Sequence, residues 1–371
     1  MSDAVILEPQ ALIVRSGSGL TTFCERPFPL IIAQAGPDAS RRFIEFFTAN
    51  IRNPNTRAAY ARAVSQFCEW CELQRLGLRD LGPFHVAAYI EQLAKRSPQQ
   101  RAVVRTAPNG ARFGATSQTL PLQAPSVKQH LAAIRMLFDW LVVGQIVPHN
   151  PAASVRGPKH VVKRGKTPVL SAEDARRLLD AIPLTRKVRR GGLEAEVADL
   201  AGLRDRALIG VMVYSFARVG AVVGMKVEDF YQNGRRSWIR LHEKGGKFHE
   251  VPAHHNAEAY VDAYLAASGI GAEKKTPLFL AASGKTNALA ATAMSRTDAF
   301  RMVKRRAKTA GLPENICCHT FRATGITAYL EAGGTIENAQ AIAAHESPRT
   351  TKLYDRTNDE LTLDEIERIV I

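Results

Sequence analysis

The sequence predicts a mainly α-helical protein of two domains: an all-α four-helix domain, then a mixed, mostly helical domain with a small antiparallel sheet. Three observations predict this fold class. The chain has 371 residues, enough for two or three domains with cores of their own. Apolar residues recur at helical spacing along most of it. Two short strand-like runs, joined by a Gly-Gly turn, lie in the second half.

Four helical patterns define the first predicted domain, residues 38–147. They cover 40–49, 56–76, 83–95 and 126–143. The preceding residues, 1–37, are predicted to be a poorly structured lead-in. Residues 97–125 are rich in proline and arginine and predict a long irregular loop. Such a loop is either functional, with DNA contact as one role, or a solvated insertion.

Residues 148–168 form the predicted linker, because no periodic apolar face runs through them. A tether with this basic cluster could lie along a phosphate backbone, and an ordinary solvated linker is the alternative. The candidate DNA-binding residues of this segment are Arg156, Lys159, Lys163, Arg164 and Lys166.

The second predicted domain covers residues 169–357. Its strand-like runs, 237–242 and 247–252, flank the turn Lys244-Gly245-Gly246-Lys247 and predict a hairpin. Helices are predicted at 172–182, 203–216, 257–267, 294–310, 319–332, 336–344 and 348–355.

The charge of the chain suits a polyanionic partner. Fifty Lys and Arg residues against 35 Asp and Glu give a formal net charge of +15, and neutralising phosphates with such residues drives binding to nucleic acid. No run is apolar enough to span a bilayer and no signal peptide is recognisable, so no membrane association is expected. Five cysteines, two of them adjacent, fit a reduced cytoplasmic setting.

Two groups of residues raise the question of a metal site, and we expect none. Cys68 and Cys71 form a Cys-x-x-Cys within a helical pattern, with no second ligand pair at zinc-finger spacing, so helix packing is the preferred interpretation. The histidines near the hairpin lack partner ligands at a suitable spacing: His242, His249, His254 and His255.

Six residues of the second domain form an ordered constellation. Their spacing is the informative part, since His319 and Arg322 share a helix face, His345 follows 23 residues later and Tyr354 nine after that. The six are Arg218, Lys244, His319, Arg322, His345 and Tyr354. In this order they resemble the catalytic residues of the tyrosine recombinase, or phage integrase, family. The resemblance covers residues 40–371 and is most specific in the second domain. The first domain resembles the family's core-binding domain only in length, helix count and position.

Three positions depart from the family pattern. The family often has an acidic residue three positions after its first arginine, where this chain has Ala221. It usually has glycine before the second histidine, where Ala344 stands, and often a histidine at the position of Ala323. None of these changes removes a catalytic group, but Ala221 leaves open how Arg218 is held.

The chemistry of strand cleavage accounts for these residue types. Two guanidinium groups, on Arg218 and Arg322, can offset charge on the non-bridging oxygens of a phosphodiester, with His345 donating a further hydrogen bond. Tyr354 is the expected nucleophile and His319 its base. Lys244 would protonate the leaving oxygen; Lys247, the less favoured catalytic lysine, is assigned to DNA contact. No cofactor, metal or ATP is expected, because the phosphotyrosyl bond retains the energy of the broken one.

The resemblance implies a site-specific recombinase that acts on double-stranded DNA at specific sites through a covalent 3′-phosphotyrosine, in a bacterial, cytoplasmic setting. Integration, replicon-dimer resolution and transposition stay open, with a mobile-element enzyme favoured. The alternatives are a DNA-binding regulator that does not cut and a type IB topoisomerase. Accessory DNA-bending proteins are possible partners.

The C-terminal tail, residues 358–371, carries an apolar helical stripe that something must cover. The stripe consists of Leu363, Ile366, Ile369 and Val370. It could pack on its own domain, whereas the resemblance favours donation to a neighbouring protomer, linking four protomers on two DNA sites.

Overall fold

The computed structural model divides the chain into two compact units, Met1–Val161 and Val162–Ile371. The division falls within residues 148–168. No helix among the described residues has the length and apolarity to cross a membrane. Side chains are described for residues 28–95, 121–160, 165, 167–189, 193–243, 246, 248–282 and 288–355.

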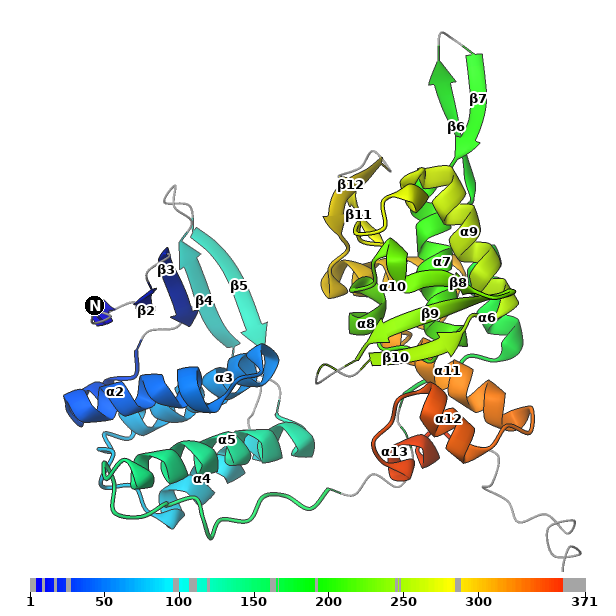
Figure 1. The fold of residues 1–371 in the computed structure, drawn as a ribbon. Coiled ribbons are helices and arrows are strands. Elements are labelled where there is room, and N and C mark those ends of the chain that lie inside the picture. Colours follow the sequence, from blue (N-terminus) through cyan, green and yellow to red (C-terminus); the bar gives the residue numbers. More distant parts are fainter. Residues whose placement is uncertain are drawn as a thin grey trace, which may run out of the picture. The chain divides into compact units, whose positions relative to one another are not determined.

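Helices build the first unit, as predicted (Figure 1). The 20-residue helices α3 (Pro54–Leu73) and α5 (Ala124–Val143) pack together, with α4 (Pro83–Lys95) against α5. Ahead of them come α1 (Leu30–Gln34), α2 (Pro37–Glu45) and the π-helical turn η1 (Phe46–Asn50). Apolar faces of these helices meet in one core, in which Phe67 makes edge-to-face contacts with Tyr89 and Phe138.

Two predictions for the first unit are wrong. Residues 97–125 contain an antiparallel hairpin, β4 (Gln100–Thr106) with β5 (Arg112–Gln118), where an irregular loop was expected. The lead-in contains a three-stranded sheet of β1 (Val5–Glu8), β2 (Ala11–Ser16) and β3 (Gly19–Cys24), in addition to α1. Apolar and polar residues alternate only weakly in these segments, so no strands are predicted from them. Their Ser, Gly and Pro residues indicate loops instead.

The cysteine pair of α3 serves packing. Cys68 and Cys71 are both buried in the first core. Burial raises the pKa of the Cys71 thiol to about 12, and the pKa of Cys68 is raised well above its usual range for the same reason. Both therefore stay protonated and behave as small apolar side chains.

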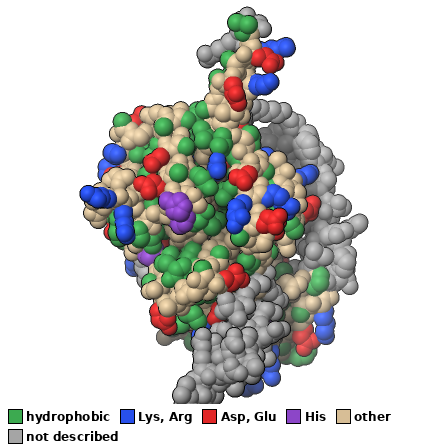
Figure 2. Space-filling model, turned by 90° about the vertical axis from the view of Figure 1, so that its right-hand side faces the viewer, with side chains coloured by type: hydrophobic (Ala, Val, Ile, Leu, Met, Phe, Trp, Pro, Cys, Tyr) green, Lys and Arg blue, Asp and Glu red, His purple; other side chains and the backbone are tan. Residues whose placement is uncertain are grey.

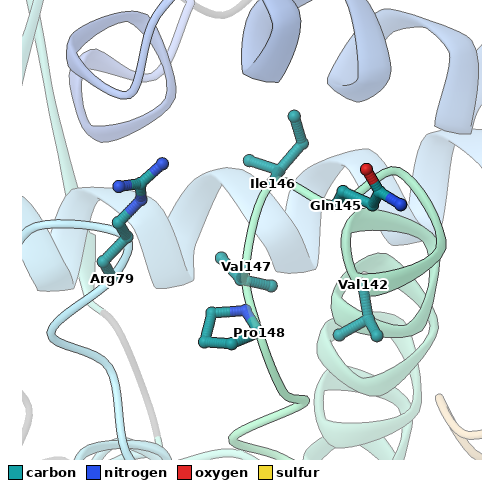
Figure 3. A pocket seen from close by; sticks show the side chains of 6 residues that line it. All are labelled: Arg79, Val142, Gln145, Ile146, Val147 and Pro148. Atoms are coloured by element: carbon teal, nitrogen blue, oxygen red, sulfur yellow. The ribbon is translucent and has the colours of Figure 1, made fainter.

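A surface hollow of the first unit lies where α5 ends. It is lined by Val142 and by the segment Gln145–Pro148, with Arg79 on the opposite side (Figure 3). Its walls are mostly apolar and offer one charged group.

The second unit surrounds a small antiparallel sheet with helices (Figure 1). The sheet has the order β10-β9-β8, with β8 (Phe230–Asn233), β9 (Arg236–His242) and β10 (Phe248–Pro252). Strands β9 and β10 form the predicted hairpin, in which Phe248 pairs with His242. Helix α7 (Leu200–Tyr214) lies against α9 (His255–Ser268) and α11 (Cys318–Glu331).

The remaining elements complete this unit. Helix α6 (Ala172–Asp180) begins at Ser171, whose side chain accepts a hydrogen bond from the backbone of Asp174. Helix α10 (Arg296–Thr309) packs on α8 (Val219–Val223). The sequence prediction missed two further hairpins: β6 (Thr185–Arg190) with β7 (Leu193–Ala198), which projects from the unit in Figure 1, and β11 (Leu280–Ser283) with β12 (Ala288–Ala293). The last two helices are α12 (Ile336–Ile342) and α13 (Pro348–Lys352).

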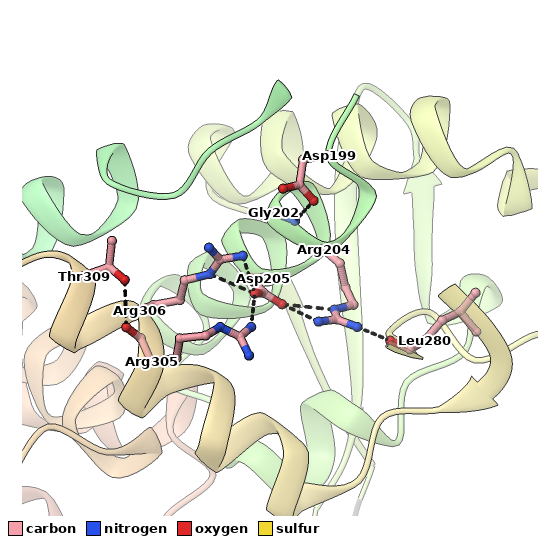
Figure 4. A network of polar contacts seen from close by, with 8 residues as sticks. All are labelled: Asp199, Gly202, Arg204, Asp205, Leu280, Arg305, Arg306 and Thr309. Carbon is pink, nitrogen blue, oxygen red and sulfur yellow. Dashed lines mark hydrogen bonds and ion pairs between the residues drawn. The ribbon is translucent and has the colours of Figure 1, made fainter. Parts of the chain in front are cut away.

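A buried charge network ties α7 to α10 and β11 (Figure 4). The carboxylate of Asp205, fully buried, accepts hydrogen bonds from Arg204 at 2.6 Å and from Arg306 at 2.9 Å. Arg305 approaches the same carboxylate at 3.3 Å, and Arg204 also donates to the carbonyl of Leu280 at 2.7 Å. Breaking such a network is costly, because buried charges lose their only compensation.

Candidate active site

Arg218 stands at the junction of two helices. Helix α7 is buried along most of its length and ends at Tyr214. Phe216 then adopts a left-handed backbone with φ of +53°, which turns the chain, and Arg218 becomes the N-terminal cap residue of α8. Its Nη1 donates to Oε2 of Glu243 at 2.6 Å. The turn therefore directs this arginine toward the residue directly after β9, where the turn of the β9–β10 hairpin begins.

Arg322 is the buried centre of the site. This residue lies on α11 and is 2% exposed. It donates from Nη1 to the carbonyl of Phe216 and from Nη2 to the carbonyl of Ala343, the latter at 2.6 Å. Burial and the neighbouring Arg218 lower the pKa of Arg322 to about 10, so it stays charged at neutral pH. Two of its five N–H groups thus hold backbone carbonyls in place.

His345 follows a second left-handed residue. Ala344, where the family usually has glycine, has φ of +47° and turns the chain out of α12. His345 is 8% exposed, and its Nδ1 lies 2.9 Å from Oγ1 of Thr351. Burial, Arg322 and Arg218 together lower the pKa of His345 to about 4. The imidazole is therefore neutral at physiological pH.

Tyr354 closes the site from the end of α13. Its ring stacks on that of His345, with 5.9 Å between the ring centroids and 4° between the planes. Its backbone is fixed at both ends: the amide donates to Thr351 and the carbonyl accepts from Thr327, each at 2.9 Å. A hydrogen bond from the Arg322 guanidinium to Tyr354 opposes the fall in the pKa of Arg322. Tyrosine, histidine and arginine thus meet at one point.

A small apolar cluster supports this meeting point. Phe216, Ile326 and Ala343 are among its buried members, and Tyr354 packs against it. It joins α11 and α12 to the turn before Arg218, so the segments that carry four of the six candidate residues share one packed base.

His319 lies one turn before Arg322, as its spacing predicts, on the exposed side of α11. Partial desolvation and the charges of Arg322 and Arg218 lower its pKa. A neutral imidazole beside two guanidinium groups can accept a proton.

The hairpin reaches the site through His249 of β10. Its Nε2 lies 2.8 Å from the carbonyl of Ile342, at the end of α12. The predicted catalytic Lys244, and Lys247, lie outside the described residues. The neighbouring Glu243 is described and is almost completely buried.

The candidate DNA-binding residues of the linker are described in part. Arg156 and Lys159 are exposed at the end of the first unit. Lys163, Arg164 and Lys166 lie outside the described residues, as does the tail from 358 to 371. Among the side chains that the structure describes, no group of three or more His, Cys, Asp or Glu could hold a metal ion. His254 instead stacks between Tyr214 and His255.

Sequence reasoning missed two residues of the site, Glu243 and Thr351. Glu243 stands next to Lys244, and an acid at the start of a hairpin turn could have been tested as the partner that Ala221 cannot supply. Thr351 lies three residues before Tyr354, which places the two on one face of a helix. No pattern in the sequence distinguished it from Thr350.

Comparison with known proteins gives the same assignment for most of the chain. A model of the phage integrase family matches residues 169–360. The tyrosine recombinase XerD of Corynebacterium glutamicum is 28% identical over 303 residues, covering 81% of this chain and 86% of the relative.

Two solved structures share the fold. A lambda integrase dimer bound to a COC′ core site superposes with a TM-score of 0.59 and 16% identity, over 87% of this chain and 79% of that one. The Tn1549 transposon integrase in complex with transposon right end DNA gives a TM-score of 0.56 and 12% identity, over 90% and 98% of the two chains.

Proposed function

Since the chain belongs to the phage integrase family and is a tyrosine recombinase, we propose that Tyr354 cuts and rejoins specific sites in double-stranded DNA. The observation that carries this proposal is the stacking of Tyr354 on His345 at 5.9 Å, beside the buried Arg322. A tyrosine placed between a neutral histidine and a guanidinium is suited to attack a phosphodiester, because both neighbours can stabilise the charge that develops.

The reaction proceeds by transesterification. The Tyr354 hydroxyl oxygen attacks the phosphorus, its proton passes to His319, and the bond from phosphorus to the 5′ oxygen breaks. Lys244 gives its proton to the leaving oxygen. The products are a 3′-phosphotyrosyl bond and a free 5′-hydroxyl. A 5′-hydroxyl from a second strand reverses these steps and completes the exchange, so no external energy is consumed.

The two arginines have different roles in this reaction. Arg218 is partly exposed and one of its N–H groups is bound to Glu243, so we assign its other N–H groups to a non-bridging oxygen. Arg322 contributes positive charge from its buried position. Two of its N–H groups hold the carbonyls of Phe216 and Ala343. Replacing either should therefore affect cleavage, and replacing Arg322 should also affect the fold of the site.

His345 acts as a neutral donor. With a pKa of about 4 it carries one ring proton at neutral pH. If the Thr351 hydroxyl donates to Nδ1, that proton sits on Nε2, the nitrogen free to bind a phosphate oxygen.

DNA binding and self-association extend the proposal. The Tn1549 integrase was solved with DNA and the lambda integrase as a dimer on its core site. The net charge of +15 supports DNA as the partner of this chain. Acidic and basic side chains are mixed on the face that Figure 2 shows. The phosphates of DNA are therefore expected to bind on another face. The tail from 358 to 371 is the proposed link between protomers, in a tetramer on two sites.

A covalent adduct assay tests the proposal. Wild type and Tyr354→Phe are incubated with duplexes from the DNA flanking the gene, in the presence of EDTA, and separated on a denaturing gel. We expect an adduct with wild type alone. An adduct that persists in Tyr354→Phe would exclude this nucleophile, and relaxation of arbitrary supercoiled plasmid would favour a topoisomerase.

A further inference from the structure

We propose that Glu243 is a positioning residue that holds Arg218 in the orientation required for cleavage. This inference rests on the proposed function of Arg218 and deepens it. Glu243 itself does not touch the DNA in this account and acts only through the arginine.

The contact between the two side chains is short, and the two differ in how far they are exposed to solvent. Arg218 Nη1 lies 2.6 Å from Glu243 Oε2. The Glu243 side chain is 3% exposed, whereas that of Arg218 is 36% exposed. The carboxylate is therefore a fixed, buried anchor, and the arginine reaches from it toward solvent. Binding one end of a planar guanidinium fork fixes the direction of its remaining N–H groups.

Arg218 has no acidic partner on its own helix. The sequence of α8 is VGAVV, with no acidic residue in its first turn. Ala221, one turn after Arg218, is 4% exposed and belongs to the main apolar core of the unit. The carboxylate must therefore come from another element, and the chain supplies it 25 residues later, directly after β9.

The same carboxylate balances the charge of the site as a whole. Arg218 lowers the pKa of the buried Arg322, and Glu243 opposes that effect by raising it. Two guanidinium groups close together repel each other, and the buried carboxylate of Glu243 offsets part of that repulsion. Glu243 thus stabilises the arrangement before DNA is present.

A double-mutant cycle tests this role. Glu243→Gln keeps the shape of the side chain and removes its charge, and Arg218→Lys removes the fork. The single-turnover rate of adduct formation is measured for both variants, the double variant and wild type, together with duplex affinity and Tm. We expect Glu243→Gln to slow cleavage by ~10-fold or more in the wild-type background, with duplex affinity nearly unchanged. Tm should fall, because the buried carboxylate no longer offsets the two guanidinium groups. In the Arg218→Lys background the effect of Glu243→Gln on cleavage should shrink to less than about 3-fold.

The outcomes separate this inference from the proposed function. Equal fold-losses in the two backgrounds, or no loss in wild type, would overturn the role of Glu243. Absence of a Tyr354-dependent adduct in wild type would overturn the function itself and the role of Arg218 with it. If Glu243→Gln unfolds, Glu243→Asp enters the same cycle; it keeps the charge but falls short of the 2.6 Å contact, so the same pattern of losses is expected.

Discussion

The ring of Tyr354 lies parallel to that of His345, 5.9 Å away, and the His345 ring is in turn bonded to Thr351 on the helix that leads to Tyr354. The contacts within residues 345–354 therefore hold His345 and Tyr354 in place. The position of the nucleophile depends on the histidine, and the position of the histidine depends on the helix of the nucleophile.

The first prediction concerns Thr351. Thr351→Val keeps the volume of the side chain and removes the hydroxyl that contacts His345 Nδ1 at 2.9 Å. Losing a hydrogen bond worth about 1–1.5 kcal/mol should slow cleavage by roughly 10-fold. Thr351→Ser is the matched control and should stay within about 3-fold of wild type. The nitrogen shifts of the His345 ring, measured by NMR, should indicate one tautomer in wild type and a mixture in Thr351→Val. Wild-type cleavage by the Val variant would refute this account.

The second prediction concerns pH. The pKa of His345 is lowered in the folded protein from 6.5 to about 4, so the folded state resists protonation that the unfolded state accepts. Stability from this group is complete above pH 6.5 and is lost as the pH falls toward 4. The loss should reach roughly 3 kcal/mol at most. Urea unfolding of wild type and His345→Asn at several pH values isolates it by difference. Parallel curves would contradict the assigned burial.

The third prediction concerns the backbone before His345. Ala344 has φ of +47°, a conformation that costs a residue with a Cβ about 1–2 kcal/mol and glycine far less. Ala344→Gly should therefore raise the free energy of unfolding by about 0.5–1 kcal/mol. Ala343→Gly, at the neighbouring buried position, should lower it. The same sign for both variants in thermal or urea unfolding would rule out strain at Ala344.

The fourth prediction concerns the network around Asp205. Asp205→Asn leaves the buried Arg204 and Arg306 without a counter-charge and should cost about 3–5 kcal/mol of unfolding free energy. Glu194→Gln breaks a 3.6 Å pair with Lys187, both exposed, in the same unit. It should cost less than about 0.5 kcal/mol. Similar urea midpoints for the two variants would show that the network contributes little.

Much of the fold follows from sequence periodicity. Helices of both units and the β9–β10 hairpin begin and end within a few residues of the prediction, because strong apolar stripes and a Gly-Gly turn specify them. The hairpin β6–β7 carries the same Gly-Gly signal at residues 191–192, yet both of its faces are largely exposed. Without apolar alternation, its strands could not be distinguished from a charged loop.

The candidate site was predictable as a list of residues but not as a geometry. Ordered spacing selected Tyr354, His345 and Arg322, and the structure brings these three together. The partner of Arg218 is 25 residues away in sequence and meets it only through tertiary packing, so the sequence around Arg218 does not reveal it. The left-handed backbone at Phe216 is likewise imposed by the surrounding packing. No glycine at this position indicates it in the sequence.

The most direct test of the central claim is the identity of the residue bound to DNA. The trapped adduct is digested with nuclease and trypsin and analysed by mass spectrometry. Trypsin cuts after Lys352 and Arg356, so the account predicts a nucleotide on the peptide Leu353–Arg356, linked to Tyr354. A nucleotide on any other residue, or an unmodified Leu353–Arg356 peptide from the purified adduct, would contradict it.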